Sequence, residues 1–311
     1  MSEPRALVIG EALVDVVVHA DGRREEHPGG SPANVALGLG RLGRPVDLLT
    51  WLAHDAYGGR VKSHLESSGV HLLTGNRSAL ATPVAIARLD AQGQASYDFE
   101  LTWDLPTAWD GDDAAPLVVH TGSIATTLKP GGPAVLRAVT ARRSTSTITY
   151  DPNARPVLMG TPLQARAIVE EFVRVADVIK ASDGDLMWLY PGQKPDDVAA
   201  RWARSGPAIV VVTHGEDGAF AATASGAHLH VPAPQVRVVD TVGAGDSFMS
   251  GLIDGLWTEG LLGASRRAAL KAIDSGVLRR VLERCIRIAA ITVSRAGANP
   301  PKRAELGETA S

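Results

Sequence analysis

Asp240-Thr-Val-Gly-Ala-Gly-Asp246, which continues as Ser-Phe-Met-Ser-Gly-Leu-Ile253, is the stretch that most restricts the fold of this chain. After the glycines, apolar residues recur at spacings of three and four, which predicts an amphipathic helix that begins close to Gly243. Gly243, Ala244 and Gly245 then lie on its first turn, where backbone N–H groups have no partner within the helix. These donors and the positive end of the helix dipole favour a phosphate or a developing negative charge.

Asp246 follows this predicted anion site directly. A carboxylate would repel a phosphate, but it can take the proton from a hydroxyl that attacks the phosphate. The alternative is a tight strand-to-helix turn, in which Asp246 only interacts favourably with the helix dipole. Taken alone, this stretch favours neither interpretation over the other.

A second motif, Gly29-Gly-Ser-Pro-Ala-Asn34, opens another predicted helix, which ends at Gly43. Ser31 is predicted to be its N-cap, and Pro32 suits the first helical position. Asn34 offers both a donor and an acceptor at the mouth of the helix, which suits a sugar hydroxyl. In isolation, the motif is explained equally well as a capped helix with an incidental asparagine.

Together the two motifs resemble the signatures of the PfkB, or ribokinase-like, carbohydrate kinase family. The first signature is matched by Gly29, Gly30, Asn34, Ala36 and Gly43, although its last glycine is Ala53 here. The second is matched in full from Asp240 to Leu252. The two signatures stand in the expected order, and the resemblance extends over nearly the whole chain.

The resemblance implies an ATP-dependent sugar kinase that uses Mg²⁺ and transfers the γ-phosphate to a primary hydroxyl. Asp246 would be the base, while Gly243, Ala244 and Gly245 would bind the transferred group. Within the family the chain looks most like fructokinases, so fructose is the leading substrate. A 2-keto-3-deoxygluconate kinase, a ribokinase and a nucleoside kinase are the alternatives. A non-catalytic protein that binds sugar or nucleotide is the alternative from another class.

A third pattern, Gly38-Leu-Gly-Arg-Leu-Gly43, fits the dinucleotide-binding fingerprint G-x-G-x-x-G. That fingerprint requires a strand before it, with the glycines forming the turn into a helix. Here the glycines lie near the end of a helix that has already begun at Pro32. The context therefore argues against a dehydrogenase.

Composition restricts the class of protein further. A chain of 311 residues with 45% apolar residues is long enough for one large α/β domain. No apolar run reaches the ~18–20 residues of a membrane span, and the start of the chain lacks a leader pattern, so the expectation is a cytoplasmic protein without a membrane partner. A net charge of −3 with interspersed signs argues against nucleic acid. The single cysteine, Cys285, excludes an internal disulfide and is predicted to be buried in a helix.

Short apolar runs alternate with helical patterns along most of the chain. Strands are predicted at 6–10, 46–50, 117–120, 147–150, 178–181 and 209–213, and helices at 32–43, 56–68, 131–143, 161–175 and 196–204. This order predicts a single α/β domain over residues 1–311, with a mainly parallel sheet covered by helices on both faces. Ligands bind at the carboxyl edge of such sheets, where both motifs are predicted to lie.

Some segments depart from this alternation. Residues at about 12–20 and 82–104 are predicted to be strands of a small separate sheet, with a turn at Asp90–Gly93. In the resembling family such insertions form a lid over the sugar site, which would exclude water; the alternative is an ordinary surface hairpin. A homodimer through the lid sheet is a further expectation. Residues 263–283 are predicted to form a solvated helix, and the tail from Pro300 to fray.

The resemblance assigns five residues to the sugar, namely Asp15, Gly29, Gly30, Asn34 and Arg155. The residue that matches Asp15 accepts hydrogen bonds from two sugar hydroxyls in the family, which suits a carboxylate. Asp151-Pro-Asn-Ala-Arg155 follows a predicted strand and is similar to runs that border the substrate in fructokinases and 2-keto-3-deoxygluconate kinases. Arg155 would bind a sugar-acid carboxylate, approach the transferred phosphate, or pair with a nearby protein acid.

The nucleotide residues are likewise implied by the resemblance. Thr213, Gly215 and Gly218 match a Thr-x-Gly-x-x-Gly nucleotide loop, for which a plain hairpin turn is the alternative. Lys180 and Ser182 lie in the run Ile179-Lys-Ala-Ser-Asp-Gly-Asp185, at the place of an Asn-x-x-Glu motif that organises magnesium and phosphate.

The same resemblance implies two cation sites. Asp185 would take the place of the glutamate and hold Mg²⁺ through water, since Mg²⁺ usually keeps several waters. Its alternative role is to cap the helix that begins there. Asp240 and Val242, together with the loop at 291–298, match the surroundings of a monovalent cation, which would be K⁺.

Overall fold

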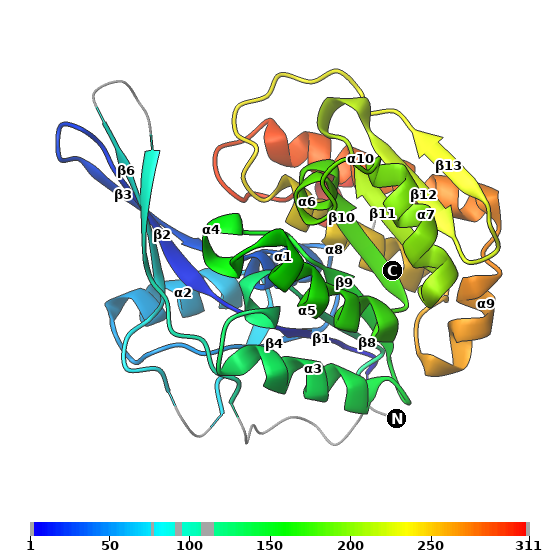
Figure 1. The fold of residues 1–311 in the computed structure, drawn as a ribbon. Helices are drawn as coiled ribbons and strands as arrows, with labels where there is room; N and C mark the ends of the chain where they lie inside the picture. The colour runs from blue at the N-terminus through cyan, green and yellow to red at the C-terminus, as the bar shows by residue number, and fades with distance from the viewer. Residues whose placement is uncertain (1–2, 76–77, 91–94, 107–114, 309–311) are drawn as a thin grey trace.

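The structure, a computed structural model, describes residues 3–75, 78–90, 95–106 and 115–308 (Figure 1). Within these ranges nine strands form the main sheet, in the order β13-β12-β11-β10-β9-β8-β1-β4-β5. All neighbours pair in parallel except β11 with β12 and β12 with β13. The strands are β1 (Ala6–Ile9), β4 (Val46–Leu49), β5 (Val70–Leu73), β8 (Val118–Gly122), β9 (Thr147–Asp151), β10 (Val178–Ser182), β11 (Ile209–Thr213), β12 (Ala219–Thr223) and β13 (His228–Val231).

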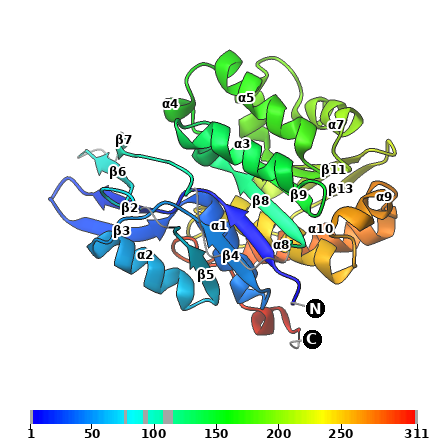
Figure 2. The ribbon, with the colours of Figure 1, turned by 90° about the horizontal axis from the view of Figure 1, so that it is seen from below.

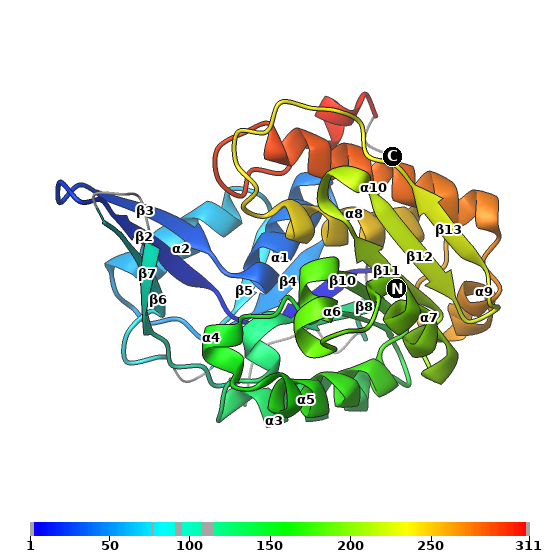
Figure 3. The ribbon, with the colours of Figure 1, turned by 45° about the horizontal axis from the view of Figure 1, so that its top comes forward.

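Helices cover both faces of this sheet, as the apolar strands require. Along β1, Ala6 and Val8 join the core on one face, and Leu7 and Ile9 join the core on the other. The first face is covered by α1 (Ser31–Arg41), α2 (Ala56–Glu66), α8 (Ala244–Thr258) and α10 (Ser275–Val293). The second is covered by α3 (Gly131–Arg142), α5 (Pro162–Val175), α6 (Asp183–Leu189) and α7 (Pro195–Ser205), as Figure 3 shows. The predicted α/β architecture is confirmed.

A small sheet stands beside the main one (Figure 2). Among the described residues it has four strands in the order β3-β2-β6-β7, namely β2 (Leu13–Val18), β3 (Arg24–Gly29), β6 (Val84–Leu89) and β7 (Ala95–Glu100). Both stretches predicted to be insertions supply strands to it. The sequence missed β3, because Arg-Glu-Glu-His-Pro-Gly has no alternation of apolar and polar residues. Most of the turn predicted at Asp90–Gly93 lies outside the described residues.

Two predictions near the C-terminal end are wrong. Residues 263–283 are not a solvated helix, because they include α9 (Arg267–Lys271) and the start of α10, whose Leu270 and Leu282 are fully buried. The tail does not fray over its described part, where η4 (Arg303–Leu306) buries Leu306. Arginine-rich composition concealed the apolar stripe of these helices. Cys285 is buried, as predicted. Among the described helices, none combines the length and the apolar character needed to span a bilayer.

Candidate active site

Two cavities meet where helix α8 begins. The first, of about 470 Å³, lies between the small sheet, the start of α1 and the loop at 153–158. The second, of about 730 Å³, lies between the β11–β12 turn, residues 233–238 and helix α10. Thr241 and Gly245 line both cavities. The predicted anion loop therefore forms the border between two sites that are each large enough for a small molecule.

The anion loop has the backbone that its glycines predict. Gly243 is the N-cap of α8, with a left-handed φ of 74°, and a Cβ there would lie 2.6 Å from the Cβ of Ala298. Only glycine suits both conditions. The helix begins at Ala244, where N–H groups have no partner within the helix. Gly243 lines the first cavity and Ala244 the second, and the Ala244 N–H donates to the Thr241 carbonyl at 3.3 Å.

Asp246, one residue further on, is only 7% exposed and lines the first cavity. Its Oδ1 accepts hydrogen bonds from Ser31 Oγ at 2.7 Å and from Asn153 Nδ2 at 3.3 Å. Its Oδ2 accepts one from Asn34 Nδ2 at 2.8 Å. All three donors are neutral, so the carboxylate is oriented without a neighbouring cation bonded to it.

The prediction that Ser31 caps helix α1 is wrong. The N-cap is Gly30, with a φ of 102°, and no side chain caps this end. Ser31 lies inside the first turn, and its hydroxyl crosses to Asp246 on α8. Sequence patterns locate caps by their place before an apolar run, and they carry no signal for a contact with a residue 215 positions away.

The sugar residues that were predicted come together around the first cavity, with one exception. Asp15, Gly30, Asn34 and Arg155 all line it. Gly29 does not; instead, a Cβ at Gly29 would overlap the carboxylate of Asp15. Gly29 therefore leaves the space in which the Asp15 side chain lies.

A buried carboxyl group, Glu11, and a half-buried one, Asp15, line this cavity. Burial raises the pKa of Asp15 to about 6, against the opposing effect of Arg155 and His27. Burial also raises the pKa of Glu11 to about 7. Glu11 accepts a hydrogen bond from the backbone N–H of Ala125 at 3.0 Å, and sequence reasoning missed it. The sequence feature that could have identified Glu11 is its position as a charged residue after the predicted strand at 6–10, in the same run as Asp15.

The loop after β9 carries Asn153 and Arg155 to the cavity. Asn153 has a φ of 36°; Ser123 is the other non-glycine residue with positive φ in the described part of the chain, and it lines the same cavity. Such backbone strain gathers at functional sites. The guanidinium of Arg155 donates to Asn153 Oδ1 at 2.6 Å and to carbonyls of its own loop. Within the described residues it donates to no carboxylate, although its positive charge opposes the rise in the pKa of Glu11 and of Asp15.

Lys180 lies beneath the anion loop. It is 2% exposed, and its Nζ is 2.7 Å from Asp151 Oδ2. A Cβ on Gly245 would lie 2.8 Å from the same Nζ, so the ammonium group touches the first turn of α8. Burial lowers the pKa of Lys180, but Asp151, Asp185 and Asp246 outweigh this effect and raise it. The lysine is thus a buried cation next to the predicted phosphate site.

Ser182 and Asp185 cap helix α6 reciprocally. Ser182 Oγ accepts from the Asp185 N–H at 3.0 Å, and Asp185 Oδ2 accepts from the Ser182 N–H at 2.8 Å. The other oxygen of Asp185 accepts from the Ala154 N–H at 2.7 Å, which ties α6 to the loop of Arg155. The capping interpretation of this motif is confirmed, and neither residue lines the first or the second cavity.

The second cavity holds the predicted nucleotide loop. Thr213, Gly215 and Gly218 line it, at the hairpin turn between β11 and β12. Phe248, Ile286 and Val293 are among the apolar residues that form its other wall. An apolar cleft that ends at a helix N-terminus suits a flat aromatic base with a phosphate chain.

The loops predicted to enclose a monovalent cation lie against each other. Asp240 Oδ1 accepts from the Val242 N–H at 3.0 Å, and Oδ2 accepts from the Gly297 N–H at 2.8 Å. In the described ranges, no group of three or more His, Cys, Asp or Glu side chains could hold a metal ion. A metal ion in the active site would therefore take most of its ligands from backbone, water or phosphate. Mg²⁺ in particular usually keeps several waters and binds substrate phosphates.

The chain is similar in sequence and in fold to known proteins. The model of the pfkB family of carbohydrate kinases matches residues 4–304. A fructokinase of Rhizobium leguminosarum bv. trifolii is 32% identical over 277 residues, which are 85% of this chain and 83% of that protein. A Xylella fastidiosa fructokinase with bound ATP has the same fold, with a TM-score of 0.80 at 23% identity over 94% of this chain and 93% of that one. A Vibrio cholerae fructokinase with fructose, ADP and calcium bound gives 0.75 at 24% identity over 95% and 94%.

Proposed function

This chain belongs to the pfkB family of carbohydrate kinases, phosphotransferases with an alcohol group as acceptor, and we propose that it phosphorylates fructose with ATP. The observation that carries the proposal is the position of Asp246. It faces the first cavity, one residue after the Gly245 that borders both cavities. A sugar in the first cavity and a nucleotide in the second would meet at this point.

In the proposed mechanism, Asp246 takes the proton of a primary hydroxyl while the sugar oxygen bonds to the γ-phosphorus. The bond from that phosphorus to the bridging oxygen of ADP breaks, and ADP leaves with the electron pair. The N–H groups of Gly243, Ala244 and Gly245 would stabilise the charge on the transferred group. Asp15 would accept hydrogen bonds from sugar hydroxyls, together with Asn34.

The nucleotide would occupy the second cavity, with its phosphates directed to the start of α8. Thr213, Gly215 and Gly218 would border it, and Lys180 would add a positive charge beneath Gly245. Mg²⁺ supplies charge neutralisation for the phosphates in such reactions. Asp185 would reach Mg²⁺ only through water, since backbone N–H groups already bind both of its oxygens. Carbonyls near Asp240 and Val242 would enclose K⁺.

Fructose is the favoured acceptor because the curated relative at 32% identity is a fructokinase. Three acids, Glu11, Asp15 and Asp246, line the cavity with one arginine, Arg155, which suits a neutral polyol better than an anion. A sugar acid such as 2-keto-3-deoxygluconate is the second candidate, because Arg155 has no acidic partner within the described residues and would be available for a carboxylate.

Three further properties are part of the proposal. Residues 1–311 act as one catalytic unit, with the small sheet as a lid over the first cavity. Two copies associate through the edge strands of that sheet, and the protein acts in the cytoplasm. Closure of the lid would exclude water from the transferred phosphate.

The test is ATP consumption against a panel of fructose, 2-keto-3-deoxygluconate, ribose and nucleosides. Fructose is expected to give the highest kcat/KM. Turnover of a nucleoside or of ribose in preference to fructose would overturn the substrate, and the absence of turnover on every acceptor would overturn the catalytic role.

A further inference from the structure

We infer that Ser31 is a positioning residue for the base, and that its hydroxyl fixes which oxygen of Asp246 receives the proton. The inference rests on the proposed role of Asp246. It assigns a catalytic contribution to a serine whose sequence context predicts only a helix cap.

The hydrogen bond between Ser31 and Asp246 joins two helices that pack closely against each other. Helices α1 and α8 approach so closely that a Cβ on Gly38 would overlap the side chain of Ser250. At the end of this interface nearest the cavities, Ser31 is 6% exposed and its Oγ lies 2.7 Å from Asp246 Oδ1. A serine on the first turn of one helix thus holds the carboxylate on the first turn of the other.

The two carboxylate oxygens differ in their surroundings. Among the residues that the structure describes, Oδ1 accepts from both Ser31 and Asn153, whereas Oδ2 accepts only from Asn34. The amides of Asn34 and Asn153 are available to exchange partners with a sugar, and Asn153 is also bonded to Arg155. The Ser31 hydroxyl has a single proton to donate, and it donates it to Oδ1. Oδ1 is therefore the anchored oxygen, and Oδ2 is left to face the sugar hydroxyl.

A neutral hydroxyl suits this task. A hydrogen bond to a charged group contributes more than one between neutral groups, so it holds the carboxylate against rotation. A lysine or arginine at the same place would bind the carboxylate as an ion pair and oppose its protonation. Because the general base must receive a proton in the transition state, a neutral hydroxyl can orient Asp246 without forming an ion pair with it.

The experiment compares variants at Ser31 by steady-state kinetics with fructose and ATP. Ser31→Ala is expected to lower kcat by about tenfold, with KM for either substrate changed by less than about twofold, because the lost contact acts on the base. Ser31→Thr keeps a hydroxyl and is expected to stay within about threefold of wild-type kcat. Ser31→Cys keeps the size but has a weak donor, and it is expected to resemble Ser31→Ala.

The matched control is Ser250→Ala. It removes a buried hydroxyl from the same α1–α8 interface, one that donates to the Ser247 carbonyl of its own helix at 2.8 Å. It is expected to keep wild-type kcat. If Ser31→Ala is too unstable to assay, the Thr and Cys variants decide the question between them.

Three results would overturn the inference: wild-type kcat in Ser31→Ala, equal losses in the Thr and Cys variants, or a rise in sugar KM at unchanged kcat. The last would make Ser31 a substrate contact. Failure of the proposed function looks different, because wild-type protein would then turn over none of the acceptors.

Discussion

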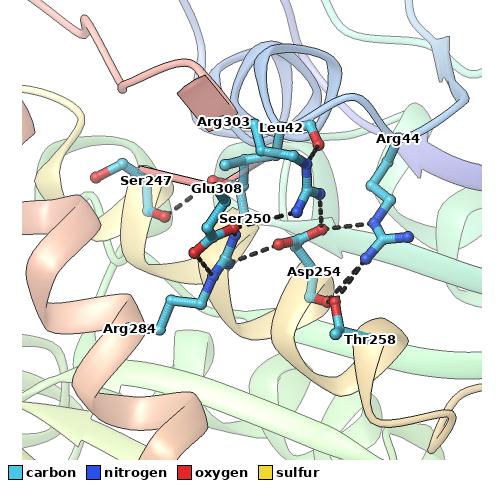
Figure 4. A network of polar contacts seen from close by, with 9 residues as sticks. All are labelled: Leu42, Arg44, Ser247, Ser250, Asp254, Thr258, Arg284, Arg303 and Glu308. Atoms are coloured by element: carbon cyan, nitrogen blue, oxygen red, sulfur yellow. Dashed lines mark hydrogen bonds and ion pairs between the residues drawn. The ribbon is translucent and has the colours of Figure 1, made fainter. Parts of the chain in front are cut away.

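Helix α8 carries two buried aspartates, Asp246 in its first turn and Asp254 further along, and their surroundings are opposite. Asp254 is fully buried among three arginines, at 2.5 Å from Arg44, 2.6 Å from Arg284 and 2.7 Å from Arg303 (Figure 4). Asp246 is bonded by one serine and two asparagines and faces a cavity.

This difference separates a structural acid from a chemical one. The Asp254 carboxylate is occupied by three guanidinium groups and lines neither of the two cavities, so it serves to hold chain segments together. It joins α8 to α10 through Arg284 and to η4 through Arg303, and Glu308 completes the cluster by pairing with both arginines. Among the described residues, Asp246 accepts hydrogen bonds from neutral donors alone, which fits its proposed role as the base. The two aspartates lie on the same helix, and their hydrogen-bond and ion-pair partners distinguish their roles.

Asp246→Asn is expected to have the largest effect on activity. Losing a general base costs about 10²–10⁴ in rate, while the amide keeps the size of the side chain, so the fold and nucleotide binding should persist. The measurement is kcat with fructose, alongside the melting temperature and ATP affinity. A variant with near-wild-type kcat would reduce Asp246 to a helix-terminus residue and remove the contrast with Asp254.

Asp254→Asn is expected to show the reverse pattern. Removing one partner of a buried ion pair costs about 3–5 kcal/mol, because the remaining charges are left uncompensated. Denaturant unfolding should therefore show a large loss of stability, while kcat of the folded protein stays close to wild type. Glu259→Gln, which alters an exposed pair with Arg280, is the control and should change the free energy of unfolding by less than about 1 kcal/mol. Loss of kcat without loss of stability in Asp254→Asn would break the comparison.

Sequence alone distinguished these acids only in part. The glycines before Asp246 predicted its anion site, and the parallel sheet predicted that distant motifs meet at one edge. Nothing local marked Asp254, whose arginine partners come from residues 44, 284 and 303. The same limit explains the errors at Ser31 and at the tail, where long-range polar contacts replaced the expected cap and the expected fraying. Strand β3 was not predicted because its sequence is polar, and pairing with its neighbour β2 is what places it in the sheet.

Asp15 is a third acid to compare: it is half-buried, and partial loss of solvent raises its pKa, which makes the comparison testable by pH. Its folded pKa is raised from 3.8 to about 6, so it contributes stability below pH 3.8 that is lost as the pH rises through about 6. Sugar binding should follow the opposite course, because the ionised carboxylate accepts the hydroxyls. At pH 5 about a tenth of Asp15 would be ionised, which predicts roughly tenfold weaker fructose binding than at pH 8.

Calorimetric titration of fructose in the absence of nucleotide tests this prediction. Asp15→Asn should bind fructose weakly at both pH values and lose most of the dependence. Glu11, with its pKa raised to about 7, titrates nearby, so Glu11→Gln is the control and should keep the change near pH 6. A pH dependence that survives in Asp15→Asn and disappears in Glu11→Gln would assign the sugar contact to Glu11.

Arg155 gives the smallest expected effect and the sharpest contrast with the arginines of Asp254. Those three are fixed by a carboxylate, whereas the Arg155 guanidinium donates only to its own loop in the described part of the chain.

If Arg155 approaches the transferred phosphate, Arg155→Lys should lower kcat/KM by about threefold on every sugar, since lysine keeps the charge and loses the planar fork. If it binds a carboxylate, the loss should fall on 2-keto-3-deoxygluconate alone. We expect the uniform loss and a preference for fructose, because Glu11 and Asp15 already make the cavity acidic. Arg174→Lys, on the exposed side of α5, is the control. A clear preference of the wild type for the sugar acid would overturn fructose as the substrate.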